Sequence, residues 1–415
     1  MCSPTPSDPV EFLEQQTSVH HDIIENRYLP DMPLNLANWI LERAENALAL
    51  ITNDSRVMEK MASDLATRWS ERHRHWHGPQ HLRSLVDSIC ADHMGETKSI
   101  LLLTALFHDA VYDPTQTDNE SLSAQLLLKS AGNGPSPAVQ TAATLIEATK
   151  WHGQPQDKLT SHFFELDAGA LRPNLKLHER FHYERAIYKE YQFAPWKTYV
   201  EKRTAFLHQW AEWYPQHESG VREALEVLSC LKPNIAIYPG SFNPFHFGHL
   251  SVLRQAERTF DKVIVAIGVN RQKLTASGGD LAQQLEARRS SLQQHQLRFH
   301  EVAAFGGLMT EFIEQQPLPI SVVRGVRDGT DLEAELRISR FMRELRPGTP
   351  VVWIGCEAAW QHVSSSSLRE LESLQTGASA RYIPLADEIY GLTNAQALYA
   401  KGQISSPLSD GTFTE

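Results

Sequence analysis

Apolar residues in the first half of the chain recur at helical spacing. From Arg56 to about Ser229 they return every three or four residues, and alternating strand patterns are almost absent. We therefore predict an all-α domain over residues 56–230, preceded by a helical extension over residues 1–55. The segments that carry the clearest helical pattern are Asn35–Ile51, His81–Cys90, Ile100–Phe107, Glu120–Leu128, Val139–Thr149 and Tyr183–Tyr191.

The pattern changes at Leu231, where short β-branched runs begin to alternate with helical segments. Such alternation is typical of a parallel sheet whose strands are joined by crossover helices. It predicts a Rossmann-like α/β domain with a five-stranded parallel sheet over residues 231–375. A C-terminal helix (Asp387–Lys401) and tail are expected over residues 376–415. The predicted strands are Ile235–Tyr238, Val263–Ile267, Leu297–Val302, Ile320–Arg324 and Val351–Ile354.

Composition narrows the class of protein. A chain of 415 residues is too long for one ordinary core, which agrees with two or three domains. The formal net charge of −11 argues against broad binding to nucleic acids or anionic membranes. The four cysteines are scattered without a CxxC pair, there is no membrane-length apolar run, and the first ten residues lack the pattern of a signal peptide. These features together predict a cytoplasmic location.

The segment Tyr238–His249 carries the most informative chemistry. It follows a predicted buried strand, contains a Gly/Pro-rich turn, and precedes a predicted amphipathic helix at Leu250–Phe260. This arrangement presents backbone N–H groups at a helix N-terminus, where phosphate binds. His246 and His249 stand at the same point. Because simple phosphate binding needs no histidine, the pair indicates transfer chemistry, in which fixed donors meet charge that grows on the phosphate.

The stretch Gly240–His249, which reads GSFNPFHFGH, resembles the GxFxPxHxGH element of the adenylyl- and cytidylyltransferase superfamily. Three further elements occur in the family's order: LMTEF at 308–312, RGVRDGTDLEAE at 324–335 and VSSSSLR at 363–369. Together they resemble the pantetheine-phosphate adenylyltransferases of coenzyme A biosynthesis. The resemblance implies that the phosphate of 4′-phosphopantetheine attacks the α-phosphate of ATP and that pyrophosphate leaves.

The resemblance also implies roles for individual residues. The implied catalytic residues are His249, His246, Lys273 and Arg327. Contacts to the nucleotide are implied for Gly240, Ser241, Phe242, His249, Arg324, Gly325, Arg327, Glu335, Ser364, Ser365 and Ser366. Contacts to the acceptor are implied for Ser241, Lys273, Leu308, Met309 and Arg324. Mg²⁺ would accompany ATP, and the chain would form a homo-oligomer.

Some positions depart from the family pattern, and they keep other interpretations open. Gly307 stands where an acidic residue often precedes Leu-Met, and Met342 stands where an Asn usually helps to hold the pantetheine arm. One alternative is therefore a nucleotidyltransferase for another phosphorylated acceptor, such as nicotinamide mononucleotide. The second alternative is a non-catalytic nucleotide-sensing fusion.

The predicted helical domain contains a second histidine-rich set. The stretch RHWHGPQH at 74–81 precedes Leu106-Phe107-His108-Asp109, and Asp118-Asn119-Glu120 and Asp167 follow. The order resembles the HD-domain metal-dependent phosphohydrolases over about Met58 to Trp213. His77 and His81, at i and i+4, are expected on one helix face. Asp167 is expected to close the site from a later helix.

The resemblance implies a divalent-metal centre with mixed nitrogen and oxygen ligands, which suits Mn, Fe, Ni, Zn or Mg. Such a metal would activate water against a phosphoester. One carboxylate of the related pattern is missing, because Gly169 stands two residues after Asp167. Hydrolysis by this domain is therefore left open beside a regulatory role. The residues expected to hold the metal are His77, His81, His108, Asp109 and Asp167.

Overall fold

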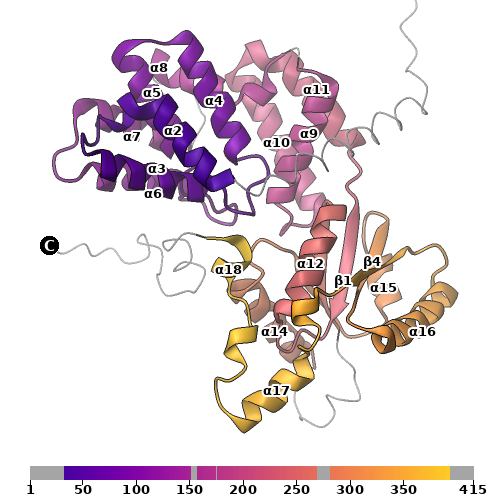
Figure 1. Cartoon of the computed structure of the whole chain (residues 1–415). Coiled ribbons are helices and arrows are strands. Elements are labelled where there is room, and N and C mark those ends of the chain that lie inside the picture. The colour runs from indigo at the N-terminus through magenta and orange to yellow at the C-terminus, as the bar shows by residue number, and fades with distance from the viewer. Residues whose placement is uncertain (1–31, 151–156, 174, 269–280, 393–415) are drawn as a thin grey trace, which may run out of the picture.

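The computed structural model describes residues 32–150, 157–173, 175–268 and 281–392. A body of helices comes first and a body built on a sheet follows (Figure 1). This order agrees with the predicted fold class of a helical half before a five-stranded parallel sheet. Among the described residues, none of the helices combines the length and the apolar character needed to cross a bilayer.

The helical half is organised around α5 (Gly95–Phe107), in which every residue from Leu101 to Phe107 is buried. A helix that is apolar on all sides must be surrounded by others. The helix α2, from the predicted N-terminal extension, packs into the same core. The other helices are α2 (Met32–Leu48), α3 (Ser55–Trp69), α4 (Pro79–Asp92), α6 (Asn119–Ala131), α7 (Pro137–Thr149), α8 (Lys158–Asp167), α9 (Leu177–Glu190), α10 (Trp196–Trp213) and α11 (Glu218–Cys230), with short 3₁₀ turns at Gly169–Leu171 and Pro215–His217.

The sheet has five parallel strands in the order β3-β2-β1-β4-β5. Both faces are covered, so successive residues of β1 enter two different cores: Ala236 and Tyr238 on one face, Ile235 and Ile237 on the other. The strands are β1 (Ile235–Gly240), β2 (Lys262–Gly268), β3 (Val302–Phe305), β4 (Ile320–Val326) and β5 (Val351–Gly355). The order reverses direction between β1 and β4, which is where such sheets bind ligands beyond the carboxyl ends of their strands.

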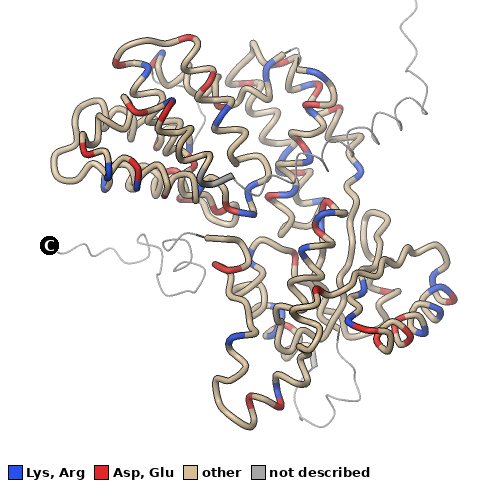
Figure 2. The backbone as a smooth tube through the Cα atoms, in the orientation of Figure 1, with Lys and Arg blue, Asp and Glu red and all other residues tan. Residues whose placement is uncertain are grey.

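Helices cover both faces of the sheet. Apolar residues of α12, α14 and α18 share one core, and those of α15 and α16 share the other. The charged residues in the first half of α16 are acidic, and those in its second half are arginines apart from Glu344, which complements the helix dipole (Figure 2). The helices are α12 (Phe247–Thr259), α14 (Leu281–His295), α15 (Met309–Glu314), α16 (Gly329–Leu345), α17 (Ser365–Leu374) and α18 (Ala386–Tyr390), with 3₁₀ turns at Ala358–Trp360 and Ala380–Tyr382.

Two sequence predictions differ from the structure. The strand predicted at Leu297–Val302 is wrong, because β3 begins only at Val302. Leu297 and Phe299 are buried as a turn leads into the strand, so their apolar character reflects core packing and not strand pairing. The helix predicted at Asp387–Lys401 is α18, which ends at Tyr390 before Gly391 in the left-handed conformation. The rest of that prediction lies beyond the described residues.

Candidate active site and metal centre

The turn after β1 brings a helix N-terminus to the carboxyl edge of the sheet. Gly240 ends β1, and a Cβ atom at this position would lie 2.7 Å from Cζ of Phe242. Phe242 itself has a φ of 45°, in the left-handed region that side chains other than glycine seldom adopt. The close packing of the ring against Gly240 accompanies this conformation, and the chain then enters α12 through its N-cap residue, His246.

His246 and His249 stack at the start of α12, with ring centroids 3.7 Å apart. The backbone N–H of Gly248 donates to Nδ1 of His246 at 3.1 Å, and the N–H of His246 donates to Nδ1 of His249 at 3.3 Å. Because a backbone amide can only donate, both Nδ1 atoms are unprotonated acceptors. Each neutral ring therefore carries its proton on Nε2 and can donate from that atom.

Burial keeps both rings neutral. Burial, with the nearby charge of Arg327, lowers the pKa of His246 to about 4. The pKa of His249 is well below its ordinary value because of burial and the neighbouring His246 and Arg327. Arg327 lowers the pKa of both histidines, so its positive charge lies close to the pair. The pair thus offers fixed N–H donors beside an arginine, an arrangement suited to a phosphate that gains negative charge.

The arginines at the carboxyl end of β4 are paired with carboxylates of α16. Arg324 donates from Nη2 to Oε1 of Glu335 at 2.6 Å and from Nε to the other oxygen. Arg327 donates from Nε to Oδ2 of Asp331 at 2.6 Å and from Nη2 to Oδ1 at 3.0 Å. The structure therefore makes Glu335, a predicted nucleotide-binding residue, the partner of Arg324. Both forks use Nε and Nη2, so Nη1 takes no part in either pair.

The serine run lies at the N-terminus of α17 and is tied to the turn after β1. Ser364 caps the helix, accepting from the N–H of Ser367 at 3.1 Å. The hydroxyl of Ser365 donates to the carbonyl of Pro244 at 2.9 Å. A guanidinium N–H of Arg369 donates to the carbonyl of Asn243, a link that sequence reasoning did not identify. These bonds bring the helix N-terminus beside the turn that carries the histidines.

The predicted acceptor-binding residues after β1 and β3 are largely exposed. Ser241 is exposed, and Leu308, which precedes α15, has 54% of its surface exposed. Met309 is the first residue of α15. Met342 is buried in the core shared with β1, β2 and β4, so it contributes to packing. Lys273 lies outside the described residues.

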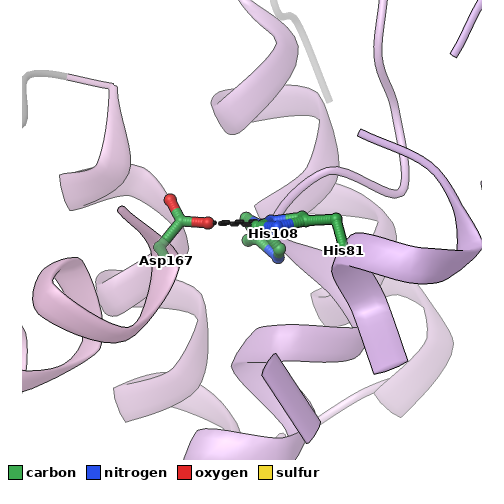
Figure 3. A group of neighbouring side chains, drawn as sticks. All are labelled: His81, His108 and Asp167. Atoms are coloured by element: carbon green, nitrogen blue, oxygen red, sulfur yellow. Dashed lines mark hydrogen bonds and ion pairs between the residues drawn. The ribbon is translucent and has the colours of Figure 1, made fainter. Parts of the chain in front are cut away.

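His81, His108 and Asp167 converge in the helical half (Figure 3). One ligand atom from each lies within 4.8 Å of the others. Nε2 of His81 lies 3.0 Å from Oδ1 of Asp167, and Nε2 of His108 lies 3.3 Å from the same oxygen. Asp109 approaches from the end of α5, with its Oδ2 3.3 Å from Nε2 of His108. Three helix ends therefore place four predicted metal ligands together.

The state of His108 fits a metal ligand. Its Nδ1–H donates to the carbonyl oxygen of Ala105 at 2.9 Å, so Nε2 is the nitrogen left to bind a metal, and that buried atom makes no well-formed hydrogen bond. A hydrogen bond from the other ring nitrogen to a carbonyl oxygen orients histidine ligands in metal sites. Burial would lower the pKa of His108, but the charges of Asp109 and Asp167 raise it well above its ordinary value. The site thus stabilises positive charge, which a divalent cation would supply.

The expectation that His77 and His81 share a helix face is wrong. α4 begins at Pro79 with Gly78 as its N-cap, so His77 lies in the preceding turn. Its ring stands beside the trio, with its centroid 5.8 Å from that of His81. Proline is favoured in the first turn of a helix because its missing N–H is not needed there. Because the helix starts at Pro79, His77 lies before it, and the i, i+4 spacing of the two histidines does not place them on one helix face.

Glu190, which sequence reasoning missed, positions His77. Its Oε2 accepts from Nδ1 of His77 at 2.6 Å and from the hydroxyl of Tyr112 at 2.7 Å. Its Oε1 accepts three successive backbone N–H groups, those of residues 75, 76 and 77, at 2.7 to 2.8 Å. The carboxylate is fully buried at the end of α9. The local sequence contains no signal for this role, because the partners lie 78 to 115 residues away.

Neutral N–H donors at a helix start, beside an arginine and a serine-rich helix end, make the C-terminal half a nucleotidyltransferase domain. A sequence model of cytidylyltransferase-like proteins matches residues 237–371. The chain is 35% identical over 140 residues to the phosphopantetheine adenylyltransferase of Acidovorax sp. (strain JS42), covering 34% of this chain and 82% of that relative. Through this region the chain belongs to the phosphopantetheine adenylyltransferase family.

Relatives from other bacteria give the same result. The phosphopantetheine adenylyltransferase of Chloroflexus aurantiacus is 36% identical over 141 residues, which are 34% of this chain and 84% of the relative. That of Porphyromonas gingivalis is 34% identical over 143 residues, which are 34% of this chain and 90% of the relative. These matches cover about a third of the chain. The candidate metal centre of the helical half lies outside the matched region and is supported by its own geometry.

Proposed function

We propose that the C-terminal half transfers the adenylyl group of ATP to 4′-phosphopantetheine, giving dephospho-coenzyme A and pyrophosphate. A phosphate oxygen of the acceptor forms a bond to the α-phosphorus, and the bond between that phosphorus and the bridging oxygen of the β-phosphate breaks. The observation that carries the proposal is the pair of neutral histidines at the start of α12, in a region shared with named phosphopantetheine adenylyltransferases.

The described residues suggest how the reaction is assisted. Nε2–H groups of His246 and His249 would donate to the oxygens of the phosphate under attack, and Arg327 would add positive charge. Ser364 to Ser366, with the N-terminus of α17, would hold the β- and γ-phosphates. Arg324, held by Glu335, would reach a phosphate with its remaining nitrogen. Mg²⁺, bound with ATP, would neutralise phosphate charge.

The proposal is tested with the full-length purified chain, ATP, Mg²⁺ and 4′-phosphopantetheine. We expect dephospho-coenzyme A and pyrophosphate in equal amounts, measured by mass spectrometry and a coupled pyrophosphate assay. The variant His249→Ala tests the role of the histidine pair in this reaction. Its matched control is His295→Ala, because His295 is exposed at the end of α14. Absence of both products from the wild-type reaction would refute the proposal.

A panel of acceptors tests the alternative substrates. If nicotinamide mononucleotide or another phosphorylated acceptor is adenylylated faster than 4′-phosphopantetheine, the acceptor assignment fails while nucleotidyl transfer stands. The implied homo-oligomer is tested in the same preparation by light scattering after size-exclusion chromatography. A monomer at micromolar concentration would contradict that assignment.

We propose in addition that the helical half binds a divalent metal and hydrolyses a phosphoester. His81, His108, Asp109 and Asp167 would hold the metal, and the bound metal would supply an activated water. The observation in favour is the buried Nε2 of His108, which makes no well-formed hydrogen bond and faces two carboxylates. His77, held by Glu190, would stand beside the centre as a further ligand or as a donor to the substrate.

This second proposal has a readout that does not depend on a known substrate. We expect the wild-type chain to take up at least one Mn²⁺, Ni²⁺ or Zn²⁺ per molecule, measured by elemental analysis after gel filtration, and His108→Ala to take up less. Hydrolysis of bis(p-nitrophenyl) phosphate then tests activity. Metal uptake without hydrolysis would favour the regulatory interpretation, and failure to load any of these metals would contradict the metal centre itself.

A further inference from the structure

Two loops contribute to the candidate metal centre or flank it, and residues of the sheet half contact both. The first loop (residues 70–78) ends with the turn that contains His77, and the second loop (residues 108–118) contains His108 and Asp109. These loops lie between helices of the helical half, and their own backbone hydrogen bonds are short-range turns such as those from Arg74 to Glu71 and from Gln116 to Asp113. What packs against them therefore determines how firmly the ligands are held.

An aromatic contact holds the first loop. The ring of His73 stacks on Phe299 of the sheet half, with centroids 4.3 Å apart and planes inclined by 25°. The N–H of Arg72 donates to the carbonyl of Tyr390, the last residue of α18, at 2.9 Å. The hydroxyl of Tyr390 in turn accepts the N–H of Phe299 at 3.3 Å. The first loop is thus held by two segments of the sheet half that are themselves bonded together.

An ion pair holds the second loop. Nη2 of Arg298 lies 2.7 Å from Oδ2 of Asp113, and its Nε donates to the hydroxyl of Thr115 at 3.2 Å. The side chains of Arg298 and Asp113 are only 14% and 12% exposed to solvent. Asp113 also receives two bonds from Thr115, so its carboxylate organises the loop as well as meeting the arginine. A pair this deeply buried is costly to break by removing one partner.

Arg74 links these contacts to the metal centre. It lies next to His73 and donates from Nη1 to the carbonyls of Asp109 at 2.7 Å and His77 at 3.2 Å. Its Nε donates to Glu71 at 3.0 Å, and neither side chain is exposed to solvent. One guanidinium therefore clamps the two loops together at the positions of two predicted metal-centre residues. If either loop lost its contact with the sheet half and moved, the hydrogen bonds of Arg74 would be disturbed directly.

The sheet half also holds the helix that positions His77. Arg185 and Lys189 of α9 lie 2.6 and 3.8 Å from the carboxylate of Asp261, which begins the segment leading into β2. Glu190, the carboxylate that binds His77, is the next residue of α9. The two loops and the end of α9 are thus each in contact with the sheet half, while His81 and Asp167 are held by α4 and α8.

We propose that the nucleotidyltransferase half is a structural part of the metal centre, and that Arg298 is a positioning residue which holds the second loop and its ligands through Asp113. The metal part of this proposal rests on the proposed function of the helical half. The physical reason is entropic, because an undocked loop samples many conformations and each must be given up when the metal binds. The fusion of the two halves would then have a structural role, because the sheet half stabilises the metal centre of the helical half.

The experiment compares Arg298→Gln with Arg289→Gln in the full-length chain. Arg289 is a matched control, since it forms an ion pair with Glu286 on α14 and lies away from the contacts with the helical half. Hydrogen–deuterium exchange is measured for peptides that cover the two loops, and Mn²⁺ affinity is measured by titration. We expect Arg298→Gln to exchange about tenfold faster in the second loop and to bind Mn²⁺ about tenfold more weakly. The control should stay within about twofold of the wild type.

A double-mutant cycle tests whether Arg298 acts through Asp113. Asp113→Asn alone should loosen the second loop, and the double variant should be no looser than the worse single variant. Additive effects would show that Arg298 acts elsewhere and would overturn the proposal. Adenylyl transfer by Arg298→Gln should remain at the wild-type rate, which confirms that the sheet half is folded.

The outcomes separate this proposal from the metal assignment. Unchanged exchange of both loops in Arg298→Gln overturns the proposal, whatever the metal affinity. Faster exchange in a chain whose wild type binds no Mn²⁺ supports the holding role and refutes the metal centre. Should Arg298→Gln fail to fold, Thr115→Val removes the hydroxyl that accepts from Arg298 and donates to Asp113 while keeping the ion pair of Arg298 with Asp113. Exchange in its second loop that matches the wild type would then overturn the proposal.

Discussion

Replacement of Glu190 by Gln is the sharpest test of how the helical half is stabilised. The carboxylate accepts five hydrogen bonds, three from backbone N–H groups and one each from His77 and Tyr112. Gln keeps the shape and one acceptor oxygen, but it removes the charge. Its NH₂ group would also face the Nδ1–H of His77 and the hydroxyl of Tyr112, both donors toward this site.

The magnitude follows from the pKa of the carboxyl group. Burial would raise the pKa of Glu190, but the charge of His77 and the hydrogen bonds it receives lower it from 4.5 to about 2. At about 1.4 kcal/mol for each pKa unit, the ionised form is stabilised by about 3 kcal/mol in the folded state. Breaking a buried ionic interaction from one side costs about 3–5 kcal/mol, which agrees. Because the folded-state pKa is depressed, this stability is present above about pH 4.5 and is lost as the pH falls toward 2.

Thermal unfolding at pH 7 measures the effect. For a domain of 150–250 residues, each kcal/mol shifts Tm by about 2–4 °C, so Glu190→Gln should lower the Tm of the helical half by about 6–12 °C. The control is Glu201→Gln, because Glu201 forms an exposed ion pair on α10 and should shift Tm by less than about 2 °C. A shift for Glu190→Gln no larger than that of the control would refute the reasoning.

Three further predictions concern the sheet half and the effect of pH. His249→Ala should lower kcat for adenylyl transfer by about 10²-fold or more with an unchanged circular dichroism spectrum, because a fixed donor is lost; a variant as active as His295→Ala would contradict the site. Ser364→Ala should lower stability by about 1 kcal/mol and weaken ATP binding, since it removes the cap of α17; urea unfolding and an ATP titration measure the two effects. Burial lowers the pKa of His73 to about 3 and that of His246 to about 4. As the pH falls from 6.5 toward 4, the unfolded chain therefore binds protons before the folded chain does, and the free energy of unfolding should decrease by about 2 kcal/mol for each histidine at pH 5. A urea-unfolding profile that stays flat over that range would contradict this prediction.

The sequence by itself determined the order of the two halves and the class of the C-terminal domain. The phosphate-binding turn is contiguous in the chain, so one stretch from Gly240 to His249 contains the strand end, the turn and the helix start. The hydrophobic period distinguishes helices from strands for the same local reason. Where an apolar run was short, as at Leu297–Val302, periodicity could not separate a buried turn from a strand.

Only the tertiary structure decided which residues act together. Glu190 meets His77 across 113 residues, and Arg298 approaches Thr115 across 183, distances over which local pattern carries no information about contact. The fold likewise pairs Arg324 with Glu335 and buries Met342 in the core. The sequence drew attention to all three residues but did not reveal these contacts. A side chain's type limits what chemistry it can perform, but its burial and its partners determine which of those possibilities it uses. Those two quantities arise when distant segments pack together.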